Sequence, residues 1–90
     1  MDTTMTLKEP AFDSLLRAVG KVVQSKRLSM GISQEELAKR AGLHRTYVSD
    51  VERGSRSVSL ITLYKLAEAL HTNAWVLIES ADVSLRELNP

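Results

Sequence analysis

The chain has 90 residues, enough for one small domain with a single core, and its 43% hydrophobic and 26% charged residues are typical of a soluble globular protein. It contains no cysteine, which excludes a disulfide framework, a thiolate metal site and a cysteine nucleophile. No apolar run approaches the roughly 20 residues that cross a bilayer, and the first ten residues lack the basic and apolar regions of a secretion signal. We therefore expect a cytoplasmic protein.

Charge is distributed unevenly along the chain, although the net charge is only +1. Residues 1–57 carry ten Lys and Arg against seven Asp and Glu, a balance of +3, whereas residues 58–90 carry two against four, a balance of −2. The basic residues therefore accompany the first part of the chain. A net charge this small supplies little non-specific affinity for nucleic acid.

The first predicted element is an amphipathic helix that follows a flexible N-terminal segment, residues 1–10. Pro10 suits the first turn of a helix, and Gly31 is expected to end the helix in a left-handed conformation after about Met30. Gly20, inside this helix, indicates either two abutting helical pieces or a close approach of another backbone. Apolar residues recur at helical spacing, namely Phe12, Leu15, Leu16, Val19, Val22 and Val23.

Two short helices are predicted next, between Ser33 and Gly54. Ser33 and Glu36 have the spacing of a capping box, in which each side chain bonds the other residue's backbone N–H. Gly42 should end the first of these helices, and Gly54 the second, which begins at about residue 44 or 45. The residues expected to face the core are Leu37, Ala38, Ala41, Val48 and Val51.

A fourth helix is predicted after a polar loop at residues 55–57, with Ser59 as its N-cap. Its inward residues are expected to be Leu60, Leu63, Tyr64, Ala67 and Leu70. The run at residues 74–78 is fully apolar and is compatible with a strand, but with four helices before it and no partner strand we favour a short fifth helix. The sequence thus predicts an all-α, five-helix domain over residues 11–81, followed by a short tail over residues 82–90 with a weak turn of helix.

The Ser33–Gly54 stretch has the features of a helix-turn-helix. Small residues, Ala38, Ala41 and Gly42, stand where two steeply crossing helices meet. The second helix leaves a face of hydroxyls, a carboxylate and arginines that can hydrogen-bond base edges or phosphates. This face consists of Arg45, Thr46, Tyr47, Ser49, Asp50 and Arg53. The pattern indicates a unit that docks on duplex DNA.

Four blocks of the chain resemble the phage repressor/Cro family of helix-turn-helix proteins, also called the xenobiotic-response-element type. They are VGKVVQSKR (19–27), GISQEELAKRAGL (31–43), YVSDVERGSR (47–56) and SLITLYKLAEAL (59–70), and together they cover roughly residues 18–80. Within the family, RTYVSDVERGSR is similar to the controller proteins of restriction-modification operons. The resemblance implies a lambda-repressor-like fold and a sequence-specific DNA-binding transcriptional regulator.

The resemblance also implies roles for individual positions. Base reading falls on Arg45, Thr46, Ser49 and Asp50. Phosphate binding falls on Gln34, Tyr47, Arg53, Arg56 and Ser57. Arg27 and Glu52 match a structural pair that joins the first helix to the recognition helix.

Several of these residues have alternative interpretations. Thr46 either contacts thymine through its methyl group or helps to cap its helix. Asp50 either accepts from cytosine or orients Arg53, three positions later, and we favour the second. Tyr47 either binds phosphate or packs on the domain. His44 and His71 are interpreted as solvated or capping residues, because no carboxylate stands near them at metal-ligand spacing.

The function predicted from these features is a homodimeric regulator of a palindromic operator, since one short recognition helix and a weak charge call for a second copy. The expected dimer interface is the apolar segment Trp75, Val76, Leu77 and Ile78. The alternative is a protein-interaction module, such as an antitoxin or a bridging factor, built on the same fold. The sequence contains no catalytic motif, and it predicts no enzyme activity, cofactor, metal or small-molecule ligand. Activation or repression is left open.

Overall fold

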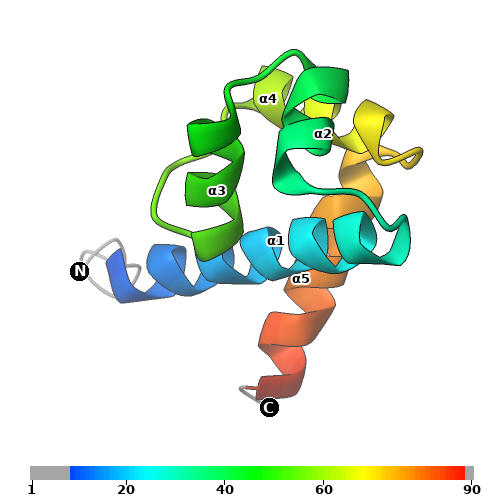
Figure 1. Ribbon diagram of the computed structural model, residues 1–90. Helices are drawn as coiled ribbons and strands as arrows, with labels where there is room; N and C mark the ends of the chain where they lie inside the picture. Colours follow the sequence, from blue (N-terminus) through cyan, green and yellow to red (C-terminus); the bar gives the residue numbers. More distant parts are fainter. Residues whose placement is uncertain (1–8, 89–90) are drawn as a thin grey trace, which may run out of the picture.

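The computed structural model describes residues 9–88, which form five helices and no strand (Figure 1). The predicted flexible N-terminal segment thus lies mostly outside the described residues, as do the last two residues of the predicted tail. Among residues 9–88, no helix is long and apolar enough to cross a membrane. The helices are α1 (Glu9–Ser29), α2 (Gln34–Ala41), α3 (Arg45–Arg53), α4 (Leu60–Ala69) and α5 (Ala74–Leu88).

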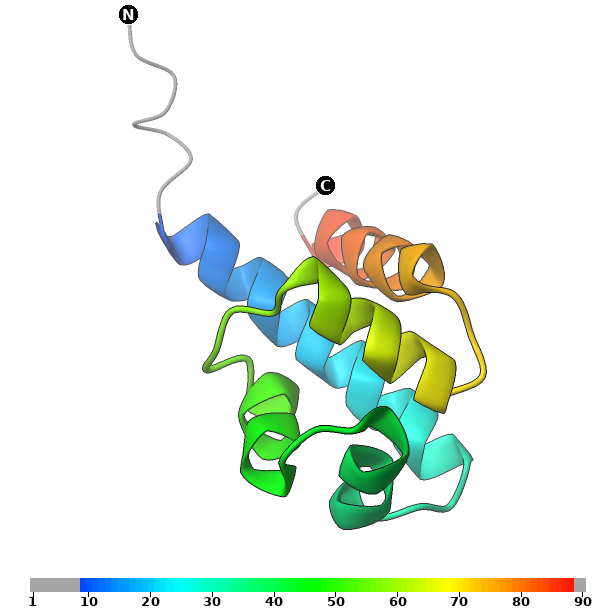
Figure 2. The same cartoon turned by 90° about the horizontal axis from the view of Figure 1, so that it is seen from above.

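Helix α1 is one unbroken helix that lies between α3 and α5 (Figure 2). A Cβ atom at Gly20 would lie 2.3 Å from the Val51 carbonyl oxygen and 2.6 Å from that of Glu52. Gly20 is therefore required by the close approach of α3, which confirms the second of the two interpretations. Gly31 ends the helix region with φ +70°, as predicted.

The ends of α2 and α3 form largely as the sequence predicts. The Ser33 hydroxyl accepts from the Glu36 backbone N–H at 3.0 Å, while Gly42 and Gly54 close the two helices at φ 68° and 72°. The reciprocal half of the predicted capping box is wrong. The Glu36 carboxylate instead accepts from Arg40 Nε at 2.8 Å, because a charged donor one turn away binds a carboxylate more strongly than a neutral N–H does.

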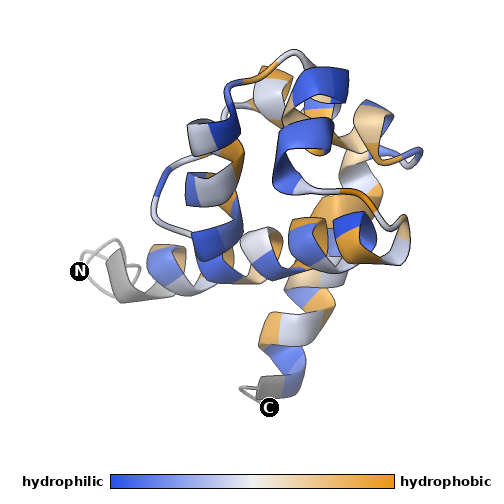
Figure 3. Ribbon diagram, viewed as in Figure 1, coloured by the Kyte–Doolittle hydropathy of each residue, from blue (hydrophilic) through white to orange (hydrophobic). Residues whose placement is uncertain are grey.

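An aliphatic core joins all five helices, and hydrophilic residues cover the outward faces of α2 and α3 (Figure 3). The largest side chains with almost no exposure are Val23, Leu37, Val48, Val51, Leu66 and Leu77. The core thus receives side chains from every helix. It fixes α2 and α3 on a frame made by α1, α4 and α5.

Two predictions for α4 are wrong, because Leu60 and Tyr64 are 68% and 63% exposed. The buried side of α4 is formed by Leu63, Leu66 and Leu70. Apolar residues surround most of this helix, so hydrophobic spacing alone does not distinguish its inner face from its outer face.

Helix α5 is longer than predicted and continues without a break across residue 82, where the tail was expected to begin. Ala74, Leu77 and Ala81 recur at helical spacing on its buried side. Leu77 is fully buried in its own chain, so its predicted role in a dimer interface is wrong. Trp75 and Ile78, by contrast, are 62% and 44% exposed.

Candidate nucleic-acid interface

The turn between α2 and α3 places the first residue of α3 at the surface. The Leu43 N–H bonds the Ala38 carbonyl at 2.8 Å, which completes the left-handed end of α2 at Gly42. His44 then accepts the Thr46 N–H on Nδ1 at 3.3 Å and caps α3. The predicted capping role of His44 is confirmed. Arg45 follows as the first helical residue and is exposed.

A buried ion pair fixes the recognition helix to the rest of the domain. Arg27 donates from Nε and Nη2 to the two carboxylate oxygens of Glu52 at 2.6 and 3.0 Å. Its Nη1 also donates to the Ile32 carbonyl at 2.9 Å. The hydrogen bond that Arg27 donates to Glu52 raises the pKa of Arg27 above its usual value, against the opposing effect of burial. The predicted structural pair therefore forms, and it joins α1, the α1–α2 loop and α3.

The same carboxylate also orients Gln34, the first residue of α2. Gln34 Nε2 donates to Glu52 Oε1 at 3.0 Å. The Gln34 side chain is thus held beside the N-terminus of α2, whose free N–H groups and helix dipole favour an anion. The predicted phosphate contact of Gln34 stays a prediction. Its tether to Glu52 was not foreseen, because 18 residues separate the two positions.

Asp50 links two arginines from different elements in the C-terminal half of the recognition surface. Its carboxylate pairs with Arg53 on α3, and its other oxygen lies 3.5 Å from Arg56 Nε in the following loop. Arg53 also donates to the Ser49 hydroxyl at 2.6 Å. The favoured interpretation, that Asp50 orients Arg53, agrees with this geometry. The link to Arg56 was missed.

Tyr47 attaches the loop after α3 to the helix. The Arg56 guanidinium carbon lies 5.0 Å from the centre of the Tyr47 ring, at cation–π distance. The Tyr47 hydroxyl donates to the Ser57 carbonyl at 3.4 Å. Tyr47 thus packs on the domain, as one of its two interpretations held. The predicted phosphate contact of Tyr47 stays a prediction.

Arg45 and Thr46 form the open half of the surface. Both are exposed, and within residues 9–88 neither side chain makes an ion pair or a hydrogen bond. The structure thus divides the predicted contact residues in two. The N-terminal end of α3 offers free donors, whereas Ser49, Asp50, Arg53 and Arg56 bond to one another. No group of three or more His, Asp and Glu side chains in residues 9–88 is arranged to hold a metal ion.

Comparison with known proteins agrees with this geometry. The helix-turn-helix family profile matches residues 23–74. The control protein C.SmaI of Serratia marcescens is 45% identical over 62 residues, which cover 69% of this chain and 74% of that protein. The crystal structure of the restriction-modification controller protein C.AhdI from Aeromonas hydrophila has a TM-score of 0.68 at 45% identity, with 69% of this chain and 94% of that chain covered.

A third relative extends the likeness over more of the fold. The crystal structure of the clp gene regulator ClgR from Corynebacterium glutamicum has a TM-score of 0.78 at 28% identity, covering 82% of this chain and 79% of that chain. The predicted lambda-repressor-like, five-helix fold is confirmed. The relatives are controllers and regulators, in agreement with the prediction that the chain is not an enzyme. The chain belongs to the helix-turn-helix family and is a DNA-binding transcriptional regulator similar to the restriction-modification controller proteins.

Proposed function

We propose that the chain acts as a homodimer on a palindromic operator and controls a restriction-modification operon. The observation that carries this proposal is the division of the α3 surface into an open N-terminal half and a bonded C-terminal half. The similarity to controller proteins supports the class of operon. Two copies of α3 would lie in successive major grooves, with half-sites about one helical turn apart.

In this proposal, the open half reads bases. Among the described residues no carboxylate pairs with Arg45, so its guanidinium is available for a bidentate contact to guanine, worth about 1–3 kcal/mol of discrimination. Thr46 lies beside it and offers a methyl group to thymine. Ser49 and Asp50 would face the same major groove of the DNA, but Arg53 bonds to both of their side chains. We therefore assign them chiefly to positioning.

In this proposal, the C-terminal half of the surface, whose side chains bond to one another, holds phosphates. Asp50 keeps Arg53 and Arg56 together although they belong to α3 and to the following loop. Holding both arginines in place before binding reduces the conformational entropy that is lost on DNA. Tyr47 and Ser57 complete this side by fixing the loop, and Gln34 binds the backbone from the start of α2. Phosphate contacts of this kind set the register of α3 and carry no sequence information.

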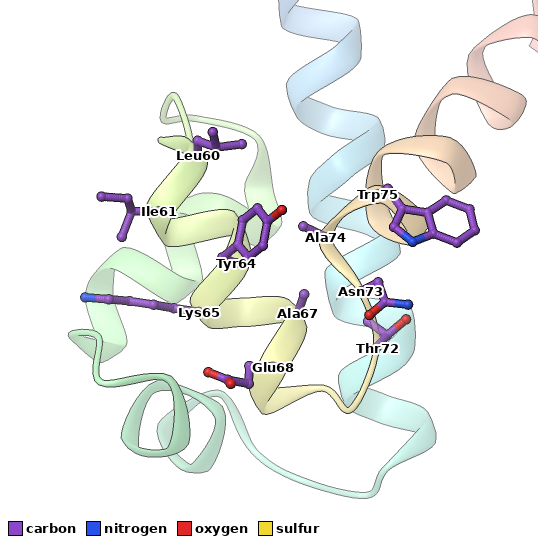
Figure 4. Close-up of a pocket in the computed structure, with 10 residues that line it drawn as sticks. All are labelled: Leu60, Ile61, Tyr64, Lys65, Ala67, Glu68, Thr72, Asn73, Ala74 and Trp75. Carbon is purple, nitrogen blue, oxygen red and sulfur yellow. The ribbon is translucent and has the colours of Figure 1, made fainter.

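The second copy would pair across an apolar groove between α4 and α5 (Figure 4). The groove has a volume of about 700 Å³, and Tyr64 on α4 and Trp75 on α5 flank it. Leu60 and Ile61, 68% and 69% exposed, extend its apolar lining. Four large apolar side chains exposed on neighbouring helices of a small domain offer a surface that a protein contact would bury. Val76 and Ile78, from the predicted interface, lie on the same helix as Trp75.

Charges in the groove favour a second copy as the occupant. Lys65 and Glu68 both line the groove, and within residues 9–88 neither forms an ion pair. They stand three residues apart on α4. A two-fold axis that sets two α4 helices antiparallel would bring Lys65 of one protomer to Glu68 of its partner. The groove of each protomer would then offer its partner both an apolar surface to bury and a charge of opposite sign.

The test is binding of Arg45→Ala and Arg53→Ala to an operator selected by the parent protein from random duplexes. Arg45→Ala should lose discrimination at one base pair of each half-site. Arg53→Ala should weaken binding to all sequences and lower the salt slope by about 1 per chain. Arg86→Ala, on α5, is the control and should bind like the parent. Parental binding by both α3 variants would refute the docking, and a monomer without DNA affinity at low salt would favour the interaction-module alternative.

A further inference from the structure

Helix α1 contacts α3 at Gly20 and again at Gly54, the residue where α3 ends. A Cβ atom at Gly54 would lie 2.7 Å from Arg17 Cα and 2.8 Å from Arg17 Cγ. The backbone and the first part of the Arg17 side chain therefore pack directly on the residue that precedes the loop 55–57. That loop contains Arg56 and Ser57, which the proposed function assigns to phosphates.

In the part of the chain that the structure describes, no carboxylate neutralises the charge of Arg17. Every arginine of residues 9–88 other than Arg17 and Arg45 forms an ion pair with a carboxylate. Asp13 stands one helical turn before Arg17, at a spacing that often gives an ion pair, yet none forms. Within residues 9–88, Arg17 makes a single long hydrogen bond, 3.4 Å to the Ser14 hydroxyl. Its guanidinium is exposed and free to meet an external anion.

We propose that Arg17 is a further DNA-backbone ligand, which extends the phosphate-binding side of the recognition surface onto α1. This inference rests on the proposed function, because it assigns the phosphate contacts to the loop that Arg17 adjoins. Arg17 lies before residue 23, where the match to the helix-turn-helix family begins. The contact would therefore be an addition made by the N-terminal part of α1, outside the part of the chain that matches the family.

The proposal has a physical rationale in the weak net charge. A chain of net charge +1 gains little from its overall field, so its affinity depends on individual cations placed against phosphates. Arg17 needs no ion pair to be broken before it binds, unlike Arg53 and Arg56, which are shared with Asp50. Its stem is already packed against Gly54, so only the end of the side chain has to be ordered.

The test compares Arg17→Gln with Arg86→Gln in the full chain. Glutamine keeps the aliphatic stem that packs on Gly54 and removes only the charge, while Arg86 is an exposed arginine on α5, on the other side of α1 from α3. The probe is a fluorescein-labelled duplex of arbitrary sequence, several helical turns long, because phosphate contacts do not depend on sequence. Binding is measured by anisotropy over a series of salt concentrations.

Arg17→Gln should lower the slope of log Kobs against log[salt] by about 0.9 per bound chain and weaken binding several-fold at low salt. Arg17→Lys should restore the slope, and Arg86→Gln should leave it unchanged. A parental slope for Arg17→Gln, beside a reduced slope for Arg53→Ala, would overturn this proposal and leave the proposed function intact. Parental slopes for both Arg17→Gln and Arg53→Ala would overturn both. An equal loss in Arg17→Gln and Arg17→Lys would show that the positive charge of Arg17 is not what binds the DNA, and would also overturn the proposal.

Discussion

The two surfaces to which function is assigned are built in opposite ways. On the α2–α3 surface, polar side chains bond to one another, and the buried Arg27–Glu52 pair ties that surface to α1. In the groove between α4 and α5, apolar side chains such as Tyr64 and Trp75 are exposed. A polar surface can be pre-organised within one chain because its hydrogen bonds form between residues of that chain. An apolar groove gains its free energy only when a second surface removes it from water.

Breaking the anchor of the α2–α3 surface should have the largest effect. Glu52→Gln leaves Arg27, a residue that is only 8% exposed, without a carboxylate partner. Stranding a buried charge costs about 3–5 kcal/mol, so we expect the free energy of unfolding to fall by roughly this amount in a urea titration. DNA affinity should fall as well, because Gln34 and α3 lose their common tether.

The exposed Glu36–Arg40 pair on α2 provides the matched control. Glu36→Gln removes the same kind of carboxylate from an ion pair at the surface, where water screens the charges, and it should change stability little. The double variant Arg27→Met with Glu52→Met should recover much of the loss, because no charge is then left buried. A Glu52→Gln protein as stable as the parent would contradict the anchoring role.

Gly20→Ala should have the second largest effect, because it disturbs the contact that holds α3 against α1. The added methyl group would meet the Val51 and Glu52 carbonyl oxygens at 2.3 and 2.6 Å, so α3 must move away from α1. Forced overpacking costs about 1–3 kcal/mol, which exceeds the roughly 1 kcal/mol that alanine gains over glycine inside a helix. Calorimetric melting should show the loss. Ser29→Ala, an exposed change near the end of the same helix, should leave stability nearly unchanged, and a stabilised Gly20→Ala would contradict the close packing.

Truncation in the groove should weaken pairing and spare the fold. Trp75→Ala removes a side chain that is 62% exposed in one chain, so the free energy of unfolding of the monomer should change by less than about 0.5 kcal/mol. The dimer dissociation constant should rise about tenfold or more, equivalent to roughly 1.4 kcal/mol. Sedimentation equilibrium measures it. Val83→Ala, on the same helix but outside the groove, should pair like the parent, and equal pairing by Trp75→Ala would exclude the groove.

The fold was predictable mainly where local signals agree. Ser33, Gly42, Gly54 and Ser59 mark helix ends through side-chain caps or a backbone that needs positive φ, and these features depend on few neighbours. The length of α5 was not predictable in this way. Its second half is polar and has no strong stop signal at residue 82, so its extent is decided by packing against α1.

The candidate site was predictable as a set of residues but not as a network. Spacing on one helix predicted the contact between Asp50 and Arg53, because residues three positions apart on a helix are neighbours. Spacing did not predict three other contacts, which are those of Asp50 with Arg56, Gln34 with Glu52 and Arg17 with Gly54. Those contacts cross between elements. They follow from the tertiary arrangement of α1, α2 and α3.

The smallest expected effect lies at the corner between α4 and α5. His71 adopts φ 57°, and its N–H and that of Thr72 bond the Glu68 and Ala67 carbonyls at 3.1 and 2.9 Å, the pattern of a left-handed helix end. Left-handed φ costs a side-chain-bearing residue about 1–2 kcal/mol, whereas glycine adopts it freely but loses about 0.5–1 kcal/mol more backbone entropy on folding. His71→Gly should therefore stabilise the fold by about 0.5–1 kcal/mol in a urea titration. His71→Ala keeps the left-handed strain and should give no gain. Because His71 lines neither the groove nor the α2–α3 surface, DNA affinity and dimer affinity should stay parental in His71→Gly. A change in dimer affinity would mean that His71 shapes the groove, which Thr72 and Asn73 of the same corner line, and a change in DNA affinity would mean that the corner is coupled to the α2–α3 surface.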